Sequence, residues 1–156
     1  MADAIAKFTM SIGGLDKAKR QMSELKAEAK KTKPLFDKAI IILEQSQMKT
    51  FRMEGRPRWK KSKRASEQGG QTLQDIGRLR QSVTASSSPS AIREFSGQTL
   101  KFGTKLIYAA SHQYGYPPKN IPKRPFLGVY AEDIKKLEQV FEQDLTSRFR
   151  MVVTRG

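Results

Sequence analysis

The sequence predicts an α+β fold: a helical hairpin and a C-terminal helix packed on a small antiparallel sheet, with a long basic loop. Three observations lead to this prediction. Apolar residues recur at intervals of three and four near both ends of the chain. Shorter stretches alternate or are bounded by glycine and proline, as strands are. Residues 52–70 follow neither period and are rich in Arg, Lys, Gly, Ser and Gln.

The first fifty residues predict a strand and two helices. Residues 4–12 alternate loosely and end at two glycines, which is typical of a short strand or arm. Residues 15–29 place Leu15, Met22 and Leu25 on one helical face. Pro34 suits the first turn of a second helix that continues to about residue 48. The short break between the two helices predicts a hairpin.

The basic loop, residues 52–70, is expected to be irregular, and mobile in the isolated protein. It contains Pro57 and the only tryptophan, Trp59. Its composition leads to the hypothesis that residues 52–64 are disordered in the free subunit and order on assembly.

Residues 71–156 predict an α+β core. Thr72 is expected to cap a short helix that ends near Leu79, and a strand is expected to begin at Ser82. Two further strands are predicted at residues 91–95 and 99–103, joined at Gly97. The remaining expected elements are a helix at 107–114, a proline-rich loop to residue 125, a helix at 134–145 and a strand at 149–153. We expect one domain, made of residues 1–50, the basic loop and residues 71–156.

The charge balance indicates an anionic partner. Thirty Lys and Arg face fifteen Asp and Glu, a formal net charge of +15. Such a surplus attracts nucleic acid or an acidic protein surface. Residues 52–64 alone hold seven basic residues and one acid, whereas residues 132–144 hold five acids and two lysines. A basic loop and an acidic helix could dock head-to-tail between copies.

The sequence offers little for catalysis. With no cysteine and one histidine, it has neither a thiolate site nor a two-histidine zinc site. No phosphate-binding glycine loop or nucleophile elbow occurs. Carboxylate binding of Mg²⁺ stays open, because that ion needs few protein ligands. We therefore expect no enzyme activity, cofactor or metal, and no membrane span.

The candidate contact residues form a basic and an acidic set. The basic set could neutralise phosphates, dock on an acidic neighbouring subunit, or simply be solvated, and Trp59 could stack on a base or anchor the loop to the core. It consists of Arg56, Arg58, Trp59, Lys60, Lys61, Lys63 and Arg64. The acidic set is a candidate face between subunits and consists of Glu132, Asp133, Glu138 and Glu142.

Four segments, read in order, resemble the phage virion morphogenesis family, which contains tail-completion proteins of Mu-like phages. They are residues 54–59 (EGRPRW), 73–82 (LQDIGRLRQS), 102–115 (FGTKLIYAASHQYG) and 121–128 (IPKRPFLG). Ile76 stands where the family pattern usually has threonine, which removes one capping hydroxyl.

The motif residues have expected structural roles. Gly77 and Gly103 suit tight turns, Gly115 suits a helix end, and Arg124 could pair with a carboxylate. The full set is Gly77, Arg78, Leu79, Gly103, Thr104, Tyr108, Ala109, His112, Gln113, Gly115, Pro122, Arg124, Pro125 and Phe126.

The resemblance implies a structural virion protein, a neck or tail-completion subunit that joins tail to head. It implies a homo-oligomeric ring, which we expect to be a hexamer, around the DNA channel. The implied partners are neighbouring neck, connector and tail proteins, with transient contact to passing DNA. The implied location is the virion, and the host cytoplasm during assembly. The alternative is a nucleic-acid-binding protein without sequence specificity that acts through the basic loop.

Overall fold

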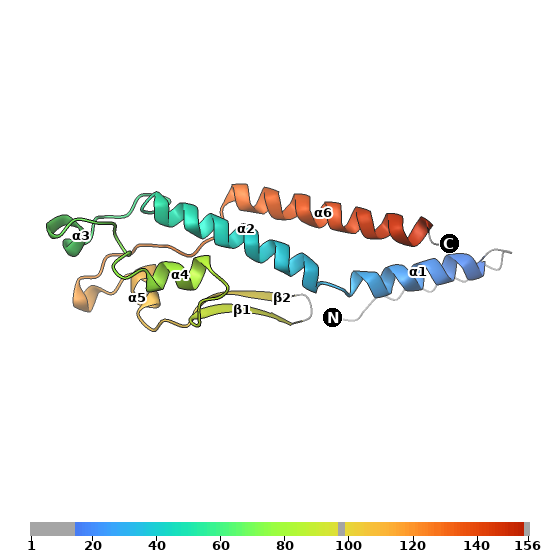
Figure 1. Cartoon of the computed structure of the whole chain (residues 1–156), viewed down its shortest axis with the longest axis horizontal. Helices are drawn as coiled ribbons and strands as arrows, with labels where there is room; N and C mark the ends of the chain where they lie inside the picture. The colour runs from blue at the N-terminus through green and yellow to red at the C-terminus, as the bar shows by residue number, and fades with distance from the viewer. Residues whose placement is uncertain (1–14, 97–98, 155–156) are drawn as a thin grey trace. The chain divides into compact units, whose positions relative to one another are not determined.

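The structure, a computed structural model, describes residues 15–96 and 99–154 (Figure 1). Its order of elements confirms the α+β class. Among the described residues the elements are α1 (Leu15–Ala29), α2 (Lys33–Arg52), α3 (Lys63–Glu67), α4 (Arg78–Thr84), β1 (Ala91–Ser96), β2 (Thr99–Thr104), α5 (Ala109–Tyr114), the 3₁₀ turn η1 (Pro117–Lys119) and α6 (Ala131–Thr154). The strand expected at residues 4–12 and the joint at Gly97 lie outside the described residues.

The chain divides into two compact units. One comprises residues 1–31 and 142–156, and the other comprises residues 32–141. In the first unit, the Arg148 side chain donates to the carbonyl of Lys31 at 2.6 Å and pairs with Asp144 at 2.5 Å. The second unit holds the sheet and every motif segment, so the site is built there. The expectation of a single domain stays a prediction.

Helix α2 is longer than expected. It begins with Pro34 in its first turn and continues past residue 48 to Arg52. Phe36, Ala39 and Leu43 are buried, as the spacing predicts. The last turns bury Ser46, Gln47, Thr50 and Phe51, which is a polar surface with one aromatic ring. The site described below is built on that polar surface.

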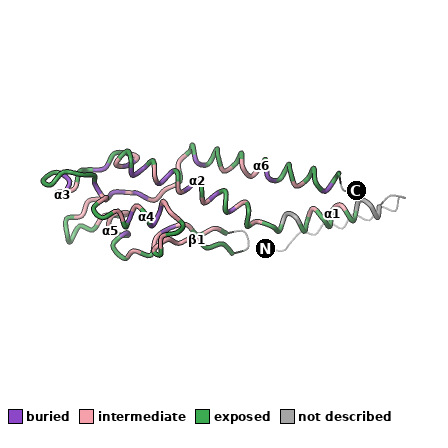
Figure 2. Tube along the Cα trace, viewed as in Figure 1, coloured by how far each residue is buried: buried purple, intermediate pink, exposed green. Residues whose placement is uncertain are grey.

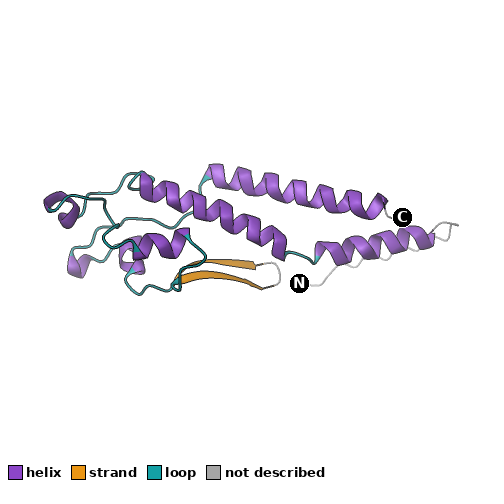
Figure 3. Ribbon diagram, in the orientation of Figure 1, coloured by secondary structure: helices purple, strands orange, loops and turns teal. Residues whose placement is uncertain are grey.

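The two predicted strands pair as an antiparallel hairpin, in register from Ala91 with Thr104 to Ser96 with Thr99. Helices α2 and α4 pack against the hairpin (Figure 3). Arg93 fixes the packing: it lies over the Phe102 ring at 3.8 Å and donates to Glu44 of α2 at 3.1 Å and to the carbonyl of Gly103 at 3.0 Å. Because a two-stranded hairpin is only marginally stable alone, these helices are needed to hold it.

The expected cap at Thr72 and the strand expected from Ser82 are wrong. Residues 72–77 form turns, Gly77 adopts a left-handed conformation (φ 78°), and α4 begins after it. Ser82 and Val83 then follow Leu79 at helical spacing, and all three are buried. The Thr72 backbone N–H instead donates to the Glu54 carboxylate at 2.8 Å.

The expected strand at residues 149–153 is also wrong, because α6 continues to Thr154. A strand needs a neighbour for its backbone hydrogen bonds, whereas a helix satisfies them internally. Val152 is buried while Met151 and Val153 are exposed. The apparent alternation therefore reflects one buried position on a helix.

The basic loop is more ordered than its composition predicts. Ser62 caps α3 by accepting a hydrogen bond from the Ala65 N–H at 3.2 Å, so residues 63–67 are helical. Trp59 is only 6% exposed and joins the core cluster. That cluster consists of Phe51, Trp59, Leu79, Val83, Ala109 and Phe126. Figure 2 shows that buried segments occur in α2 and α4 as well as in the loops.

Aromatic contacts centre the core on Phe51. Its ring meets the Trp59 ring edge-on with centroids 5.4 Å apart, and the Phe126 ring at 6.0 Å. Such pairs contribute about 1 kcal/mol each beyond the area they bury. The end of α2, the basic loop and the segment before α6 therefore share one core.

The tight turn at Gly55 delivers Trp59 to that core. Gly55 has φ 109° and forms an isolated antiparallel bridge with Arg58. A Cβ atom at this position would lie 2.5 Å from both the Pro57 carbonyl oxygen and Trp59 Cδ1. Only glycine fits here.

Replacing Gly55 by alanine should destabilise the protein by more than about 2 kcal/mol, because it adds a backbone clash to the cost of the left-handed conformation. The measurement is the free energy of unfolding in urea. Gly69→Ala is the matched control: its φ is also positive (77°), but nothing lies within 4 Å of the added Cβ. It should cost about 1 kcal/mol. Equal losses in the two variants would contradict the packing described for Gly55.

Candidate functional site

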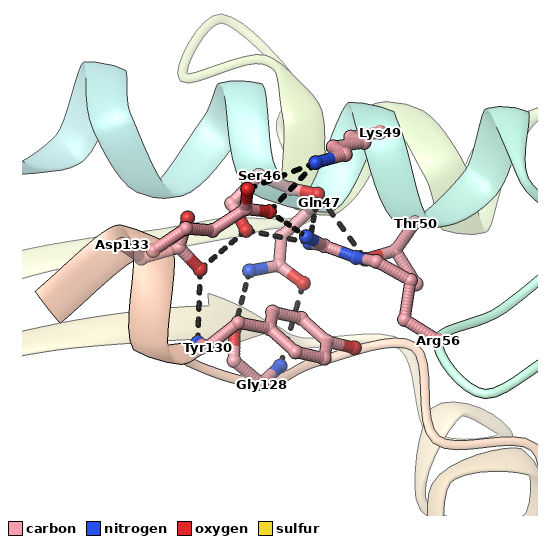
Figure 4. Close-up of polar contacts among 9 residues, drawn as sticks. Ser46, Gln47, Lys49, Thr50, Arg56, Gly128, Tyr130 and Asp133 are labelled. Atoms are coloured by element: carbon pink, nitrogen blue, oxygen red, sulfur yellow. Dashed lines mark hydrogen bonds and ion pairs between the residues drawn. The ribbon is translucent and has the colours of Figure 1, made fainter.

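The most densely bonded site is a network around Arg56, seated on the polar end of α2 (Figure 4). We call it the Arg56 network. The Arg56 Nε–H donates to Thr50 Oγ1 at 2.8 Å, and Nη2 donates to the carbonyl and hydroxyl oxygens of Ser46, both at 2.6 Å. Nη1 pairs with Glu132 Oε1 at 2.6 Å. The guanidinium also stacks 3.6 Å above the Tyr130 ring.

Ser46 and a further side chain of α2, Gln47, join the start of α6 and the segment before it to this network. The Ser46 hydroxyl donates to Asp133 Oδ2 at 2.6 Å, and the Tyr130 N–H donates to the same oxygen at 2.9 Å. Gln47 donates to the carbonyl of Gly128 at 2.8 Å and accepts from the Gly128 N–H at 3.3 Å. Gln47 and Asp133 are both almost fully buried. Their hydrogen bonds offset the cost of burying them.

The Glu132 carboxylate contacts two cationic side chains, those of Lys49 and Arg56. Lys49 Nζ lies 2.8 and 2.9 Å from its two carboxylate oxygens, beside the Arg56 contact. The Lys49 hydrogen bond, followed by the charges of Lys49 and Arg56, lowers the pKa of Glu132 below its ordinary value. The Glu132 carboxyl therefore protonates at a lower pH than an ordinary glutamate, which favours the ionised pair.

Arg56→Ala should destabilise the protein by about 3 kcal/mol, because the buried hydroxyl oxygens of Ser46 and Thr50 lose the donor that Arg56 provides. Arg58→Ala is the matched control. The Arg58 side chain is 79% exposed and lies 3.8 Å from Glu54, so its loss should change stability by less than about 0.5 kcal/mol. Urea unfolding of both variants measures the difference. A similar small loss in both would show that the network contributes nothing.

A second set of contacts ties the basic loop to the proline-rich segment. The Trp59 indole N–H donates to the carbonyl of Pro125 at 2.9 Å. The Arg124 side chain donates to the carbonyls of Lys60 at 2.9 Å and Lys61 at 3.5 Å. The expected carboxylate partner of Arg124 is therefore replaced by two backbone carbonyls. The two segments lie side by side as a result.

Gln113 holds the end of the same segment. Its side-chain oxygen accepts from the N–H groups of Phe126 and Leu127, both at 3.0 Å, and its amide donates to the Leu127 carbonyl at 2.8 Å. Gly115 ends α5 with φ 83°, as expected for a helix-ending glycine. These bonds bring Phe126 into the core.

His112 lies beside a cavity of about 360 Å³. The cavity is lined by Ser62, Arg64, Leu73, Asp75, Ile76, Gly77, Arg78, Leu79, Tyr108 and His112. Among the described residues, the buried His112 Nδ1 has no hydrogen-bond partner. Burial, and secondly the charge of Arg124, lowers the pKa of His112 below its ordinary value of 6.5. The imidazole is therefore neutral at neutral pH.

The lowered pKa makes the fold sensitive to mild acid. The unfolded chain protonates His112 near pH 6.5, whereas the folded chain resists protonation, so stability is full above that pH and falls as the pH drops below it. Because the chain has one histidine, His112→Asn should flatten this dependence between pH 7 and 5. Urea midpoints across that range measure it. An unchanged slope in the variant would contradict this assignment.

The structure divides the basic set. Arg56 and Trp59 are bonded inside the subunit, and Arg64 donates to the carbonyl of Gln71 at 2.9 Å. Arg58, Lys60, Lys61 and Lys63 are exposed. Trp59 anchors the basic loop to the core, so its ring is not free to stack on a base. Sequence reasoning gave these residues equal weight, because solvation of a charge run cannot be told from burial by composition.

The structure also divides the acidic set. Glu132 and Asp133 bond within the Arg56 network, and Glu138 and Glu142 are exposed on α6. A contact between subunits through Glu132 would have to compete with Arg56 and Lys49.

The remaining motif residues have structural positions. Leu79, Ala109 and Phe126 are core, and Arg78 is the exposed first residue of α4. Gly103 lies within β2 rather than at a turn, and Thr104 accepts from the Leu106 N–H at 3.2 Å. Tyr108 precedes α5, with its ring edge-on to His112 at 6.2 Å, and Pro122 lies in the irregular loop.

Sequence reasoning missed Arg93, Glu44, Ser46 and Gln47. The signal was faint: polar residues interrupt the buried face of α2, and β1 contains one arginine, whose side chain is only 8% exposed. Within residues 15–96 and 99–154, no group of three or more acidic or histidine side chains could hold a metal ion. No helix in that part of the chain is long and apolar enough to cross a membrane.

Together these contacts define an α+β protein in which buried motif side chains connect distant segments of the subunit through hydrogen bonds and core packing. The model of the phage virion morphogenesis family matches residues 14–146, and the chain belongs to that family. Family membership indicates a structural rather than a catalytic role in the bacteriophage particle. No curated protein and no solved structure matches the chain.

Proposed function

We propose that this protein is a neck or tail-completion subunit that joins the tail to the head and forms a homo-oligomeric ring, a hexamer, around the DNA channel. Membership of the virion morphogenesis family is the observation that carries the proposal. The ring would lie in the virion among neck, connector and tail proteins, and would form in the host cytoplasm.

Exposed apolar side chains support assembly. Ile107 is 96% exposed, Ile76 is 73% exposed, and Tyr108 and Tyr114 are also exposed. Ile76 and Tyr108 line the same cavity, and Ile107 precedes Tyr108 in the chain. Large apolar side chains gathered in this way are typical of surfaces that a protein partner covers. A ring of identical subunits would bury such a surface once per interface.

The alternative function, binding of nucleic acid without sequence specificity through the basic loop, is favoured by the exposed lysines of that loop. Light scattering at moderate salt, with and without DNA, separates the two functions. A discrete ring-sized mass supports the neck subunit. A monomer that binds DNA tightly near physiological salt supports the alternative.

Ile107→Asp should weaken self-association at least about tenfold, because it places a charge in the proposed interface. Its fold should be unaffected, since the side chain is already in water. Met22→Asp, at another exposed apolar position (68% exposed), is the control. The mass distribution as a function of protein concentration measures both variants. Unchanged association of the Ile107 variant would remove this surface from the interface.

A further inference from the structure

We infer that two segments far apart in the sequence form a rigid lysine ridge that contacts the phosphate backbone of double-stranded DNA. The ridge comprises the exposed lysines of residues 60–63 and 119–123, namely Lys60, Lys61, Lys63, Lys119 and Lys123. The inference gives the proposed neck subunit its DNA-facing surface, and it rests on that function only for its biological setting.

Arg124 builds the ridge. Its side chain donates to the carbonyls of Lys60 and Lys61, and its N–H donates to the carbonyl of His112 at 2.7 Å. The neighbouring indole bond from Trp59 to Pro125 fixes the same two segments. The backbones of Lys60, Lys61 and Lys123 are thus held together while their side chains remain in solvent. The ordering of the backbone is already achieved in the free subunit, which lowers the entropic cost of binding.

The ridge is strongly and uniformly positive. Residues 60–63 and 119–123 together contain five lysines and no acid. Among the described residues, Lys60, Lys61, Lys119 and Lys123 have no ion pair, and Lys63 lies 3.9 Å from Glu67 with its side chain 87% exposed. The charges of the four unpaired lysines are therefore not neutralised by ion pairs among the described residues, and they give the ridge a positive potential.

The chemistry of the ridge favours DNA over an acidic protein. Neither segment exposes a large apolar side chain, and protein interfaces need such anchors and are depleted in lysine. Lysine side chains are, in contrast, suited to phosphates, which they neutralise without reading sequence. The exposed apolar residues Ile76 and Ile107 lie outside both segments.

The position of Trp59 determines how DNA would be held. Because the indole is buried and bonded to Pro125, it cannot stack on an extruded base. The lysines therefore contact phosphates, and Trp59 adds no stacking that would require an unpaired strand. Arg56 and Arg124, whose guanidinium groups bond inside the subunit, take no part.

The test compares two triple variants of the full chain that carry the same net charge. Lys60, Lys61 and Lys123 are changed to Gln in the ridge variant, and Lys26, Lys101 and Lys135, exposed elsewhere, are changed to Gln in the control. Binding of a fluorescent duplex of mixed sequence is measured by anisotropy as a function of salt. Emission of the single tryptophan is recorded in the same titrations.

In the ridge variant the slope of log affinity against log salt should shrink by about 2 to 3, since each lost phosphate contact removes about 0.9. Affinity near 0.1 M salt should fall at least about tenfold, and the control should change the slope by less than about 1. Tryptophan emission should change little on binding. Equal losses in both variants, no duplex binding by the wild type at low salt, or strong tryptophan quenching would each overturn the inference.

Light scattering of the same samples keeps this inference separate from the proposed function. Loss of the ridge effect in a protein that still forms rings would refute the ridge and leave the neck subunit standing. A protein that never forms rings but shows the ridge effect would refute the ring-forming neck subunit and leave the lysine ridge standing.

Discussion

The buried guanidinium of Arg56 is the interaction on which the site depends. A guanidinium has five N–H donors in a fixed plane and no acceptor, so its burial requires oxygens on several sides. Here Ser46 and Thr50 of α2 and Glu132 of α6 provide them, and the Tyr130 ring covers one face. These groups come from two places in the second unit, the end of α2 and the start of α6 with the residue before it. The position of the basic loop, the exit of α2 and the start of α6 are therefore fixed by one side chain.

This arrangement separates the charges of the loop into two kinds. Arg56 and Arg124 donate hydrogen bonds to oxygens within the subunit, which the planar guanidinium with its several donors allows. The lysines, which are compact and strongly hydrated, remain outside. A net charge of +15 thus comprises a structural part that salt barely screens and an exposed part that salt screens readily.

The core of the second unit is small and partly polar. Ser46, Gln47, Thr50, Thr72, Ser82 and Asp133 are buried together with a few aromatic and aliphatic side chains. Polar groups of this kind fix one arrangement of the loops, because each unmet hydrogen bond is costly. The large apolar side chains left in solvent, Ile107 above all, suit a subunit that buries further surface on assembly.

The sequence alone determined the α+β class, the strands of the hairpin, helices α1, α2 and α5, and the family, because these depend on local period and on motif letters. It misplaced the start of α4 and made a strand of residues 149–153, since backbone conformation there is decided by Gly77 and by the absence of a strand partner in the described sheet. Only the tertiary structure decided which basic residues are buried and hydrogen-bonded within the subunit. Arg56 and Arg58 are two positions apart and identical in type, yet one is 11% exposed and the other 79%. The difference arises from oxygens at the end of α2 together with Glu132 and the Tyr130 ring, which are more than 70 residues away in the sequence, and no local pattern contains that information.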